Sequence, residues 1–300
     1  TSWPRWRACD DRAVDETSTP APCPFVVGPL DVGGVDVYVT TNDAEYADEV
    51  RWAMADLSTD PRPSAPQVRF ATVRQVRPWV HWSMWRDAEP CELVMEESYV
   101  LFHQQWELNR IMLERTRHAL HAATAVLDER AVVFVGATMS GKTTCAGWLA
   151  THGGSYLGDE VTSINEDGTV TGFQRPLGLR SGGPLDGRRQ RDGHQRSRFV
   201  GGEVLAPISS LGGRRHSGPP PPPGAIVFPR VNGGSRTSLD RIGPAEALVG
   251  LCTASPSMMT ARDETFAVLA GLVRRVPCAT LLLGEMAPVA GIIHQLLGER

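Results

Sequence analysis

Hydrophobic and polar residues in the first third of the chain follow short periods that predict a small domain of strands and helices. They alternate over residues 35–39 and 68–73, which is the pattern of half-buried strands. Residues 43–57 between these runs have the spacing of an amphipathic helix, with Asn42 or Asp43 as its cap. This part of the chain therefore predicts a small α+β domain.

A second helix is expected over residues 100–119, at the end of this domain. Residues 1–24 mix charge, Thr, Ser and Pro, and we expect them to form a loosely ordered arm. Residues 25–119 would then be the small α+β domain with its linking helix, and residues 120–300 a larger domain. The apolar stripe of the linking helix is expected to consist of Leu101, Trp106, Leu108, Met112 and Leu113.

The larger domain opens with strands, a glycine-rich loop and a helix. Residues 122–126 and 131–135 are rich in strand formers, and the second run leads directly into the glycines. Residues 143–151 are expected to form a helix. A short strand is expected over residues 154–157, with residues 161–164 as its continuation.

The rest of the larger domain alternates between loop, strand and helix. Residues 181–224 are rich in Gly, Pro and Arg, so much of this segment is expected to be loop. The alternation, without an internal repeat, predicts the α/β (α+β) class. Beyond the loop we expect strands at residues 225–228 and 279–283 and helices at residues 244–253, 263–273 and 289–297.

Composition narrows the class of function. A net charge of −4 provides no general attraction to nucleic acid or to an anionic membrane. No apolar run approaches the roughly 20 residues that cross a bilayer, and the first residues lack the pattern of a signal peptide. The six cysteines are scattered without a C-x-x-C pair, which is typical of reduced thiols. We therefore expect a cytoplasmic protein that binds neither nucleic acid nor membrane.

A single lysine stands out against this composition. Of the 30 basic residues, only Lys142 is a lysine and the others are arginines. A position that keeps lysine in such a chain is expected to need a compact ammonium group, which a planar guanidinium cannot replace. Lys142 lies in a G-x-x-x-x-G-K-T motif.

This motif matches the P-loop pattern, and a buried strand leads into it. Its glycines allow successive backbone N–H groups to turn inward and form an anion site at a helix N-terminus. In this pattern Lys142 reaches the β- and γ-phosphates and the Thr143 hydroxyl ligates Mg²⁺. We therefore expect ATP or GTP, together with Mg²⁺. The expected nucleotide-binding residues are Gly136, Ala137, Thr138, Met139, Ser140, Gly141, Lys142, Thr143 and Thr144.

Two adjacent carboxylates, Asp159 and Glu160, follow the short strand after the P-loop helix. Placed this close to the loop, one carboxylate can hold Mg²⁺ while the other accepts a proton from an incoming hydroxyl. An acidic turn between strands, without a chemical role, is the alternative.

With these motifs the chain resembles the HPr kinase/phosphorylase family and its relatives in ribosomally made peptide natural-product (RiPP) pathways. The similarity covers about residues 100–250. It depends on the P-loop and on residues 106–110, 120–123, 157–160, 174–180 and 226–230. The first of these segments, Trp-Glu-Leu-Asn-Arg, is similar to one that precedes the kinase core in the natural-product branch.

The resemblance implies a kinase core like that of phosphoenolpyruvate carboxykinase. It implies that Lys142 and Thr143 bind phosphate and metal. Asp159 would be the general base, also near the metal, and Glu160 a metal ligand or a supporting carboxylate. His121 would lie near the acidic pair and orient it. Because family members are often oligomers, a homo-oligomer is expected as well.

The chain departs from the family at two places. Glu160 stands where the family usually has a second aspartate. Thr138 and Met139 stand in the loop where smaller residues are commoner. The glycine-rich signature of the true HPr enzymes is absent, so HPr is not expected as the substrate, and the sequence leaves open whether phosphorylase activity exists.

Several arginines are candidates for contacts with phosphate or substrate, because guanidinium binds phosphate through two hydrogen bonds. Arg175, Arg180 and Arg230 are the candidate clamps, with a solvated surface charge as the alternative for each. Residues 186–216 carry seven more arginines. This segment would attract an acidic peptide or a phosphorylated small molecule, or would be a solvated loop.

The sequence therefore predicts an ATP- and Mg²⁺-dependent kinase that phosphorylates a Ser or Thr hydroxyl of a peptide or protein, in RiPP tailoring. A small-molecule kinase for a sugar, nucleoside or antibiotic is one alternative. A nucleotide-binding regulatory module without phosphoryl transfer is another. An open groove along the arginine-rich segment would favour the peptide, and a closed pocket the small molecule.

Overall fold

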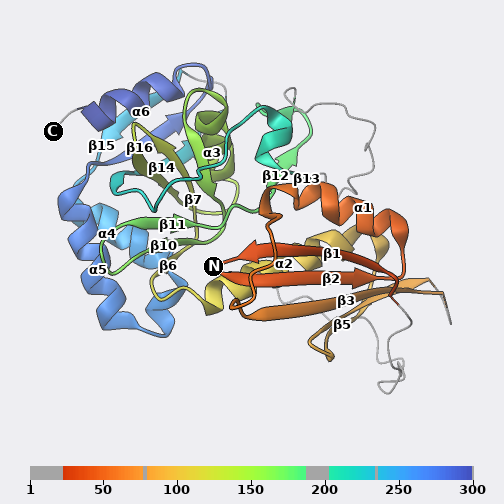
Figure 1. Cartoon of the computed structure of the whole chain (residues 1–300). Helices are drawn as coiled ribbons and strands as arrows, with labels where there is room; N and C mark the ends of the chain where they lie inside the picture. The colour runs from red at the N-terminus through yellow and green to blue at the C-terminus, as the bar shows by residue number, and fades with distance from the viewer. Residues whose placement is uncertain (1–22, 77–79, 187–202, 234–235, 299–300) are drawn as a thin grey trace.

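The computed structural model describes residues 23–76, 80–186, 203–233 and 236–298 (Figure 1). The arm expected at residues 1–24 lies outside this part except for its last two residues, and so do most of the arginines between residues 186 and 216. Helices and sheets are both extensive, which confirms the mixed α and β class.

The first sheet has five strands paired in chain order, and it includes the two strands expected from alternation. Its second and third strands are parallel and the other pairs are antiparallel. The parallel pair is connected through helix α1 (Ala44–Ala53) and a short 3₁₀ turn, η1 (Ala55–Leu57), which together fill the segment expected to be helical. The strands are β1 (Phe25–Val32), β2 (Val35–Thr41), β3 (Gln67–Gln75), β4 (His81–Arg86) and β5 (Glu89–Met95).

Asp43 is the cap of α1, since its side chain accepts a hydrogen bond from the Tyr46 backbone N–H over 2.9 Å. The helix then packs on the sheet, where the Tyr46 and Trp82 ring centroids are 5.0 Å apart. The second helix covers the same face of the sheet, because Thr72 on β3 donates a hydrogen bond to Gln104 over 3.1 Å. Both helices therefore help to close the core of the small domain.

That second helix, α2 (Val100–Glu114), is preceded by a 3₁₀ turn, η2 (Glu97–Tyr99), and is shorter than expected. The prediction of helix to residue 119 is wrong, because the chain leaves the helix at Arg115 and Ala119 already belongs to a strand. The expected apolar stripe is wrong in two positions, since Trp106 and Leu113 are 41% and 38% exposed. The other three expected residues of the stripe, Leu101, Leu108 and Met112, are buried in the core.

The second sheet has six strands in the order β15-β16-β14-β8-β7-β9. Strands β16, β14 and β8 are parallel to each other, whereas the pairs β15–β16, β8–β7 and β7–β9 are antiparallel. The bounds are β7 (Ala122–Leu127), β8 (Arg130–Val135), β9 (Ser155–Gly158), β14 (Pro223–Val231), β15 (Ser238–Arg241) and β16 (Cys278–Leu283). The strands expected at residues 122–126, 131–135, 154–157, 225–228 and 279–283 all lie in this sheet.

Helices cover both faces of the six-stranded sheet, so this part of the molecule has three layers (Figure 1). Alternate residues of β8 show why: Val132 and Phe134 share a core with the helices on one face, and Val133 and Val135 with those on the other. One face carries α3 (Lys142–Thr151) and α6 (Val289–Gly298). The other carries α4 (Pro244–Thr253) and α5 (Arg262–Arg275), with the 3₁₀ turn η5 (Pro256–Met259) between them. All four helices agree with the sequence-based expectation.

Residues 161–164 do not continue β9, which corrects the expectation. They form β10 (Thr162–Ile164), which pairs with β11 (Val170–Gly172) and β6 (Ala119–Leu120) in a separate three-stranded sheet. The chain changes direction at Glu160, whose φ of 66° is incompatible with an extended strand. The acidic pair therefore lies at a break between two sheets.

The segment expected to be mostly loop, residues 181–224, contributes one strand to a strand pair beside α3. Strand β12 (Leu177–Arg180) pairs with β13 (Glu203–Ala206), which precedes the 3₁₀ turn η4 (Ile208–Leu211). Helix α1 of the small domain lies next to this pair (Figure 1). The Ser209 backbone N–H also donates to Asp56 Oδ2 over 3.1 Å, so the two parts of the molecule are in direct contact.

In the described part of the chain, no helix combines the length and the apolar composition needed to cross a membrane.

Candidate active site

The glycine loop connects β8 to α3 and has the backbone geometry of an anion site. Gly141 has a φ of 104°, and Met139, although not a glycine, has a φ of 68°. A side chain at Gly141 would collide with Leu283 on β16. A Cβ atom on Gly136 would lie 2.8 Å from Ser140 Oγ. The positive φ and the contact with β16 therefore favour glycine at position 141, and Gly136 leaves room for the Ser140 side chain.

Lys142, the single lysine, lies inside this loop. Only 5% of it is exposed, and its ammonium donates hydrogen bonds to the carbonyl oxygens of Gly136 and Ala137 over 3.0 and 3.1 Å. Burial lowers the pKa of Lys142, while the carboxylates of Asp159 and Glu160 oppose that shift. A buried ammonium held by carbonyls at the helix N-terminus is well placed to meet phosphate oxygens.

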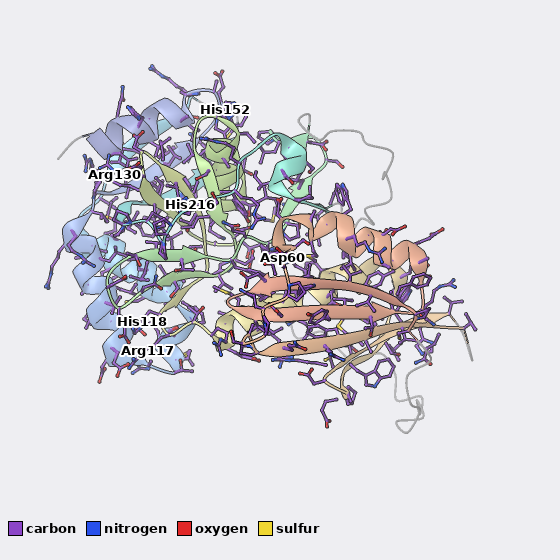
Figure 2. The ribbon with its side chains drawn as sticks, viewed as in Figure 1. Asp60, Arg117, His118, Arg130, His152 and His216 are labelled. Atoms are coloured by element: carbon purple, nitrogen blue, oxygen red, sulfur yellow. The ribbon has the colours of Figure 1, made fainter. Side chains whose placement is uncertain are left out.

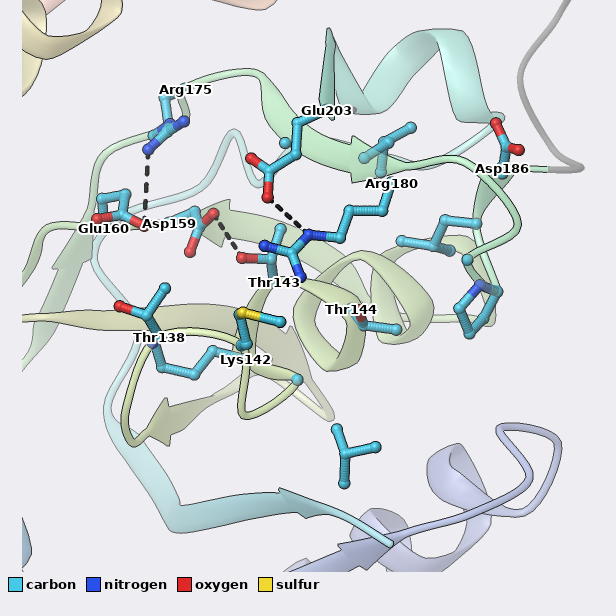
Figure 3. A pocket seen from close by; sticks show the side chains of 18 of the residues that line it. Thr138, Lys142, Thr143, Thr144, Asp159, Glu160, Arg175, Arg180, Asp186 and Glu203 are labelled. Atoms are coloured by element: carbon cyan, nitrogen blue, oxygen red, sulfur yellow. Dashed lines mark hydrogen bonds and ion pairs between the residues drawn. The ribbon is translucent and has the colours of Figure 1, made fainter. Parts of the chain in front are cut away.

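Asp159 is linked to the loop through the next residue of α3. The Thr143 hydroxyl donates to Asp159 Oδ2 over 2.9 Å (Figure 3). Asp159 is 2% exposed, and its Oδ1 atom is buried without a hydrogen-bond partner among the described residues. Burial and the adjacent charge of Glu160 raise the pKa of the Asp159 carboxyl. A buried carboxylate oxygen with an unused lone pair is what a bound cation would satisfy.

Glu160 points to a different set of partners. Its Oε2 lies 3.2 Å from His121 Nδ1 and its Oε1 lies 3.7 Å from the Arg175 guanidinium. Burial opposes ionisation, but the hydrogen bond from His121 and the charges of Arg175, His121 and Lys142 together lower the pKa of Glu160. The expectation that His121 lies beside the acidic pair agrees with this geometry. The two carboxylates thus lie in different surroundings although they are adjacent in sequence.

The position of the acidic pair depends on two glycines that allow strands to pass closely. A Cβ on Gly158, just before the pair, would lie 2.6 Å from the carbonyl carbon of Gly172 on β11. The Asp159 backbone N–H donates to the Phe173 carbonyl over 2.9 Å, which fixes the strand end there. Sequence reasoning did not identify this close crossing, because the two glycines are 14 positions apart.

Residues of the glycine loop and both residues of the acidic pair line one cavity of about 290 Å³, which lies between the loop and the β12–β13 pair. From the loop side it is lined by Thr138, Met139, Gly141, Lys142, Thr143 and Thr144. Gly136, Ala137 and Ser140 do not line it and instead shape the loop. The other predicted residues that line the cavity are His121, Asp159, Glu160, Arg175 and Arg180.

The three candidate arginine clamps have different positions. Arg175 is 7% exposed and contacts Glu160, as described above. Arg180 lines the cavity and donates from Nε to Glu203 Oε1 over 2.8 Å (Figure 3). Arg230 is exposed near the end of β14 and does not line the cavity, so the structure does not bring it to the site. Glu203 and Asp186 also line the cavity, and sequence analysis missed both because they lay in a segment expected to be loop.

Three other histidines, labelled in Figure 2, have structural partners and do not line this cavity. His118 is buried with its Nδ1 atom 3.1 Å from the Thr265 hydroxyl. The ring of His152 stacks on Trp148 with centroids 3.9 Å apart. His216 Nε2 lies 2.9 Å from a backbone carbonyl three residues along. Among these four histidines, only His121 lines the cavity.

No group of three or more His, Cys, Asp or Glu side chains within the described residues forms a metal site built from protein alone. Mg²⁺ does not require one, because it keeps several waters and binds through one or two carboxylates plus substrate phosphates. Thr143 and Asp159 fit that need, since their oxygens are adjacent and one oxygen of Asp159 is unsatisfied. Thr143 and Asp159 are therefore the candidate residues for holding Mg²⁺ together with a phosphate.

Comparison with known proteins adds no relative: the sequence matches no protein-family profile and no curated protein.

Proposed function

We propose that the protein is an ATP- and Mg²⁺-dependent kinase that transfers the γ-phosphate of ATP to a hydroxyl of a peptide or protein substrate. The observation that carries the proposal is the Thr143–Asp159 hydrogen bond, which joins a P-loop to an acidic pair in one cavity with Lys142. The resemblance to the HPr kinase/phosphorylase family and its natural-product branch supports the same activity. It also supports a core of that family's type within the three-layered part of the molecule.

The glycine loop and Lys142 bind the phosphates in this proposal. The backbone N–H groups of the loop and the dipole of α3 favour negative charge at the helix N-terminus. Lys142 gives up its carbonyl partners and donates to the transferring group, where its fixed charge stabilises the transition state. Arg180 is close enough to the same cavity to bind the outer phosphate oxygens.

Thr143 and Asp159 would hold Mg²⁺, which would neutralise charge on the phosphates. This division differs from the sequence-based expectation that Asp159 is the base and Glu160 a metal ligand. It is supported by geometry, because Asp159 contacts Thr143 whereas Glu160 contacts His121 and Arg175. In this division the buried carboxylate, Asp159, is the one that would bind the cation.

Glu160 then contacts the hydroxyl of the acceptor substrate. It is the more accessible of the two carboxylates, with 30% of its side chain exposed. His121 and Arg175 fix its two oxygens, so it can orient the acceptor hydroxyl and take its proton as the new O–P bond forms, while the bond from the γ-phosphorus to the bridging oxygen breaks and ADP leaves. A cavity of about 290 Å³ is at the lower limit for one small ligand, so the nucleotide fills it and the hydroxyl enters from outside. A Ser or Thr side chain on a peptide meets that requirement, as does a hydroxyl of a small molecule, and the resemblance to the natural-product branch favours the peptide.

The experiment is to incubate the purified protein with Mg²⁺ and γ-labelled ATP, with peptides or metabolites encoded or made by the same gene neighbourhood. Label is expected on an acceptor, and Lys142→Met is expected to abolish transfer. If the Lys142→Met variant transfers phosphate as fast as wild type, the proposed kinase site is wrong. ATP binding without transfer to any acceptor would favour a regulatory nucleotide-binding module, and label on a metabolite alone would identify a small-molecule kinase.

A further inference from the structure

Arg180 and Glu203 are directly opposite each other on the antiparallel pair β12–β13. The Arg180 Nε atom donates to Glu203 Oε1 over 2.8 Å, and both side chains line the cavity that also contains Lys142 and Thr143. Gly178 leaves the room for this arrangement, since a Cβ there would lie 3.1 Å from Glu203 Oε2. The Glu203 carboxylate therefore lies on the cavity wall and holds the Arg180 guanidinium through this hydrogen bond.

The Arg180–Glu203 ion pair is weak enough for a phosphate to replace Glu203 as the partner of Arg180. The Arg180 and Glu203 side chains are 48% and 35% exposed, and ion pairs with that exposure contribute little to stability. A phosphate oxygen offers guanidinium two parallel charge-assisted hydrogen bonds, which are stronger than a single exposed contact. An incoming polyphosphate can therefore displace Glu203 from Arg180 without disturbing the strand pair.

Resting on the proposed function, we infer that Glu203 is a positioning residue that competes with the nucleotide for Arg180. Before nucleotide binds, Glu203 keeps the guanidinium on the β12–β13 wall. When the triphosphate enters the cavity, Arg180 transfers its hydrogen bonds from Glu203 to the terminal phosphate. Glu203 thereby sets how tightly the triphosphate is held, and it acts entirely through Arg180.

The test is calorimetric binding of an ATP analogue with a non-transferable γ-phosphate, in Mg²⁺, to four proteins: wild type, Glu203→Gln, Arg180→Gln and the double variant. Glu203→Gln is expected to tighten binding by about two- to fivefold, the range of an exposed ion pair. Arg180→Gln is expected to weaken binding by about tenfold or more. In the Arg180→Gln background, Glu203→Gln is expected to have no effect. ADP is expected to respond less than the triphosphate to every substitution.

Asp186→Asn is the matched control, because Asp186 is a carboxylate on the same cavity wall whose Oδ2 accepts from the Gly182 backbone N–H and not from Arg180. If Asp186→Asn tightens binding as much as Glu203→Gln, the effect is general electrostatics and the inference fails. It also fails if Glu203→Gln has the same effect with and without Arg180, or none in an otherwise wild-type chain with an unchanged melting temperature. Wild-type protein that binds no nucleotide would instead overturn the proposed function and, with it, this inference.

Discussion

The Thr143 hydroxyl donates a hydrogen bond to Asp159 Oδ2 over 2.9 Å, and this contact joins the first turn of α3 to the end of β9. The two residues are 16 positions apart, and each follows a strand of the six-stranded sheet. Lys142 precedes Thr143 in the chain and lies inside the glycine loop, close enough to Asp159 for that charge to oppose the fall in its pKa. The phosphate loop and the acidic pair are therefore one electrostatic unit.

If Thr143 and Asp159 hold Mg²⁺ together, removing the hydroxyl must weaken the metal site. Thr143→Val is expected to raise the Mg²⁺ concentration needed for half-maximal phosphoryl transfer by about 10- to 100-fold. Thr143→Ser retains the hydroxyl and is expected to remain near wild type. A Mg²⁺ titration of the transfer rate checks both. Equal Mg²⁺ requirements for the Val and Ser variants would remove Thr143 from the metal site.

The crossing of Gly158 and Gly172 makes a prediction about stability that does not depend on function. Gly158→Ala is expected to lower the free energy of unfolding by at least about 3 kcal/mol, because the new Cβ would meet backbone atoms that cannot move aside. Gly271→Ala is the matched control. Gly271 lies inside α5 with no atom within 4 Å of a built Cβ, so alanine there is expected to stabilise by about 0.5–1 kcal/mol.

Denaturant unfolding of the two alanine variants measures both values. Similar stability of the two would mean that β9 and β11 can separate at little cost. The position of the acidic pair would then not be fixed by this crossing.

The chemical groups of the candidate site could be predicted because their signals are local. The P-loop occupies eight consecutive positions, and the carboxylates follow the next strand directly. Nearly all long helices and central strands could be predicted for the same reason, since periodicity within one segment determines which face is buried. Helix α4 (Pro244–Thr253), for instance, begins and ends where the sequence indicates.

What could not be predicted depends on contacts between distant segments. The Arg180–Glu203 pair requires the register of two strands whose facing ends are 23 positions apart in the sequence, about which local pattern says nothing. The turn at Glu160 adopts a backbone conformation that few non-glycine residues favour, so a strand was expected to continue through it. Arg230 looked like a clamp because of its neighbours in sequence, yet its place near the end of β14 leaves it on the surface.

The small domain contains an ion pair between a buried carboxylate, Asp36, and the partly exposed Arg62, and its effect on stability depends on pH. The Asp36 side chain is fully buried and accepts from the Arg62 backbone N–H over 2.9 Å and from Arg62 Nε over 2.8 Å. The backbone hydrogen bond is the largest cause of the lowered pKa of Asp36. The guanidinium contributes further, while burial opposes it. Since the folded-state pKa is lowered, this stabilisation is present above the unfolded value of about 3.9 and is lost as pH falls through the folded value.

Asp36→Asn is therefore expected to be less stable than wild type at pH 7, and the difference is expected to shrink below about pH 4. Thermal unfolding midpoints of both proteins between pH 7 and pH 2.5 measure it. Asp60→Asn removes an exposed carboxylate from the same part of the chain (Figure 2) and is expected to leave the midpoint unchanged at pH 7. A constant gap between Asp36→Asn and wild type over the whole range would exclude ionisation of Asp36 as the cause.

The roles of Asp159 and Glu160 can be distinguished by measuring nucleotide binding and phosphoryl transfer independently. Asp159→Asn is expected to weaken Mg²⁺-dependent nucleotide binding by about 10- to 100-fold, because it removes the buried charge beside Thr143. Glu160→Gln is expected to leave that binding within about twofold but to lower the transfer rate by about 10²- to 10⁴-fold, the range for loss of a general base. Calorimetry with a non-transferable ATP analogue gives the first quantity, and label transfer at saturating ATP gives the second.

The opposite pattern, with binding lost in Glu160→Gln and transfer alone lost in Asp159→Asn, would restore the sequence-based roles. His121→Asn provides an independent check, because His121 Nδ1 lies 3.2 Å from Glu160 Oε2. It is expected to lower the transfer rate without changing nucleotide binding, and to have little further effect in the Glu160→Gln background. An additive loss in the double variant would mean that His121 acts on the acceptor directly and does not work by positioning Glu160.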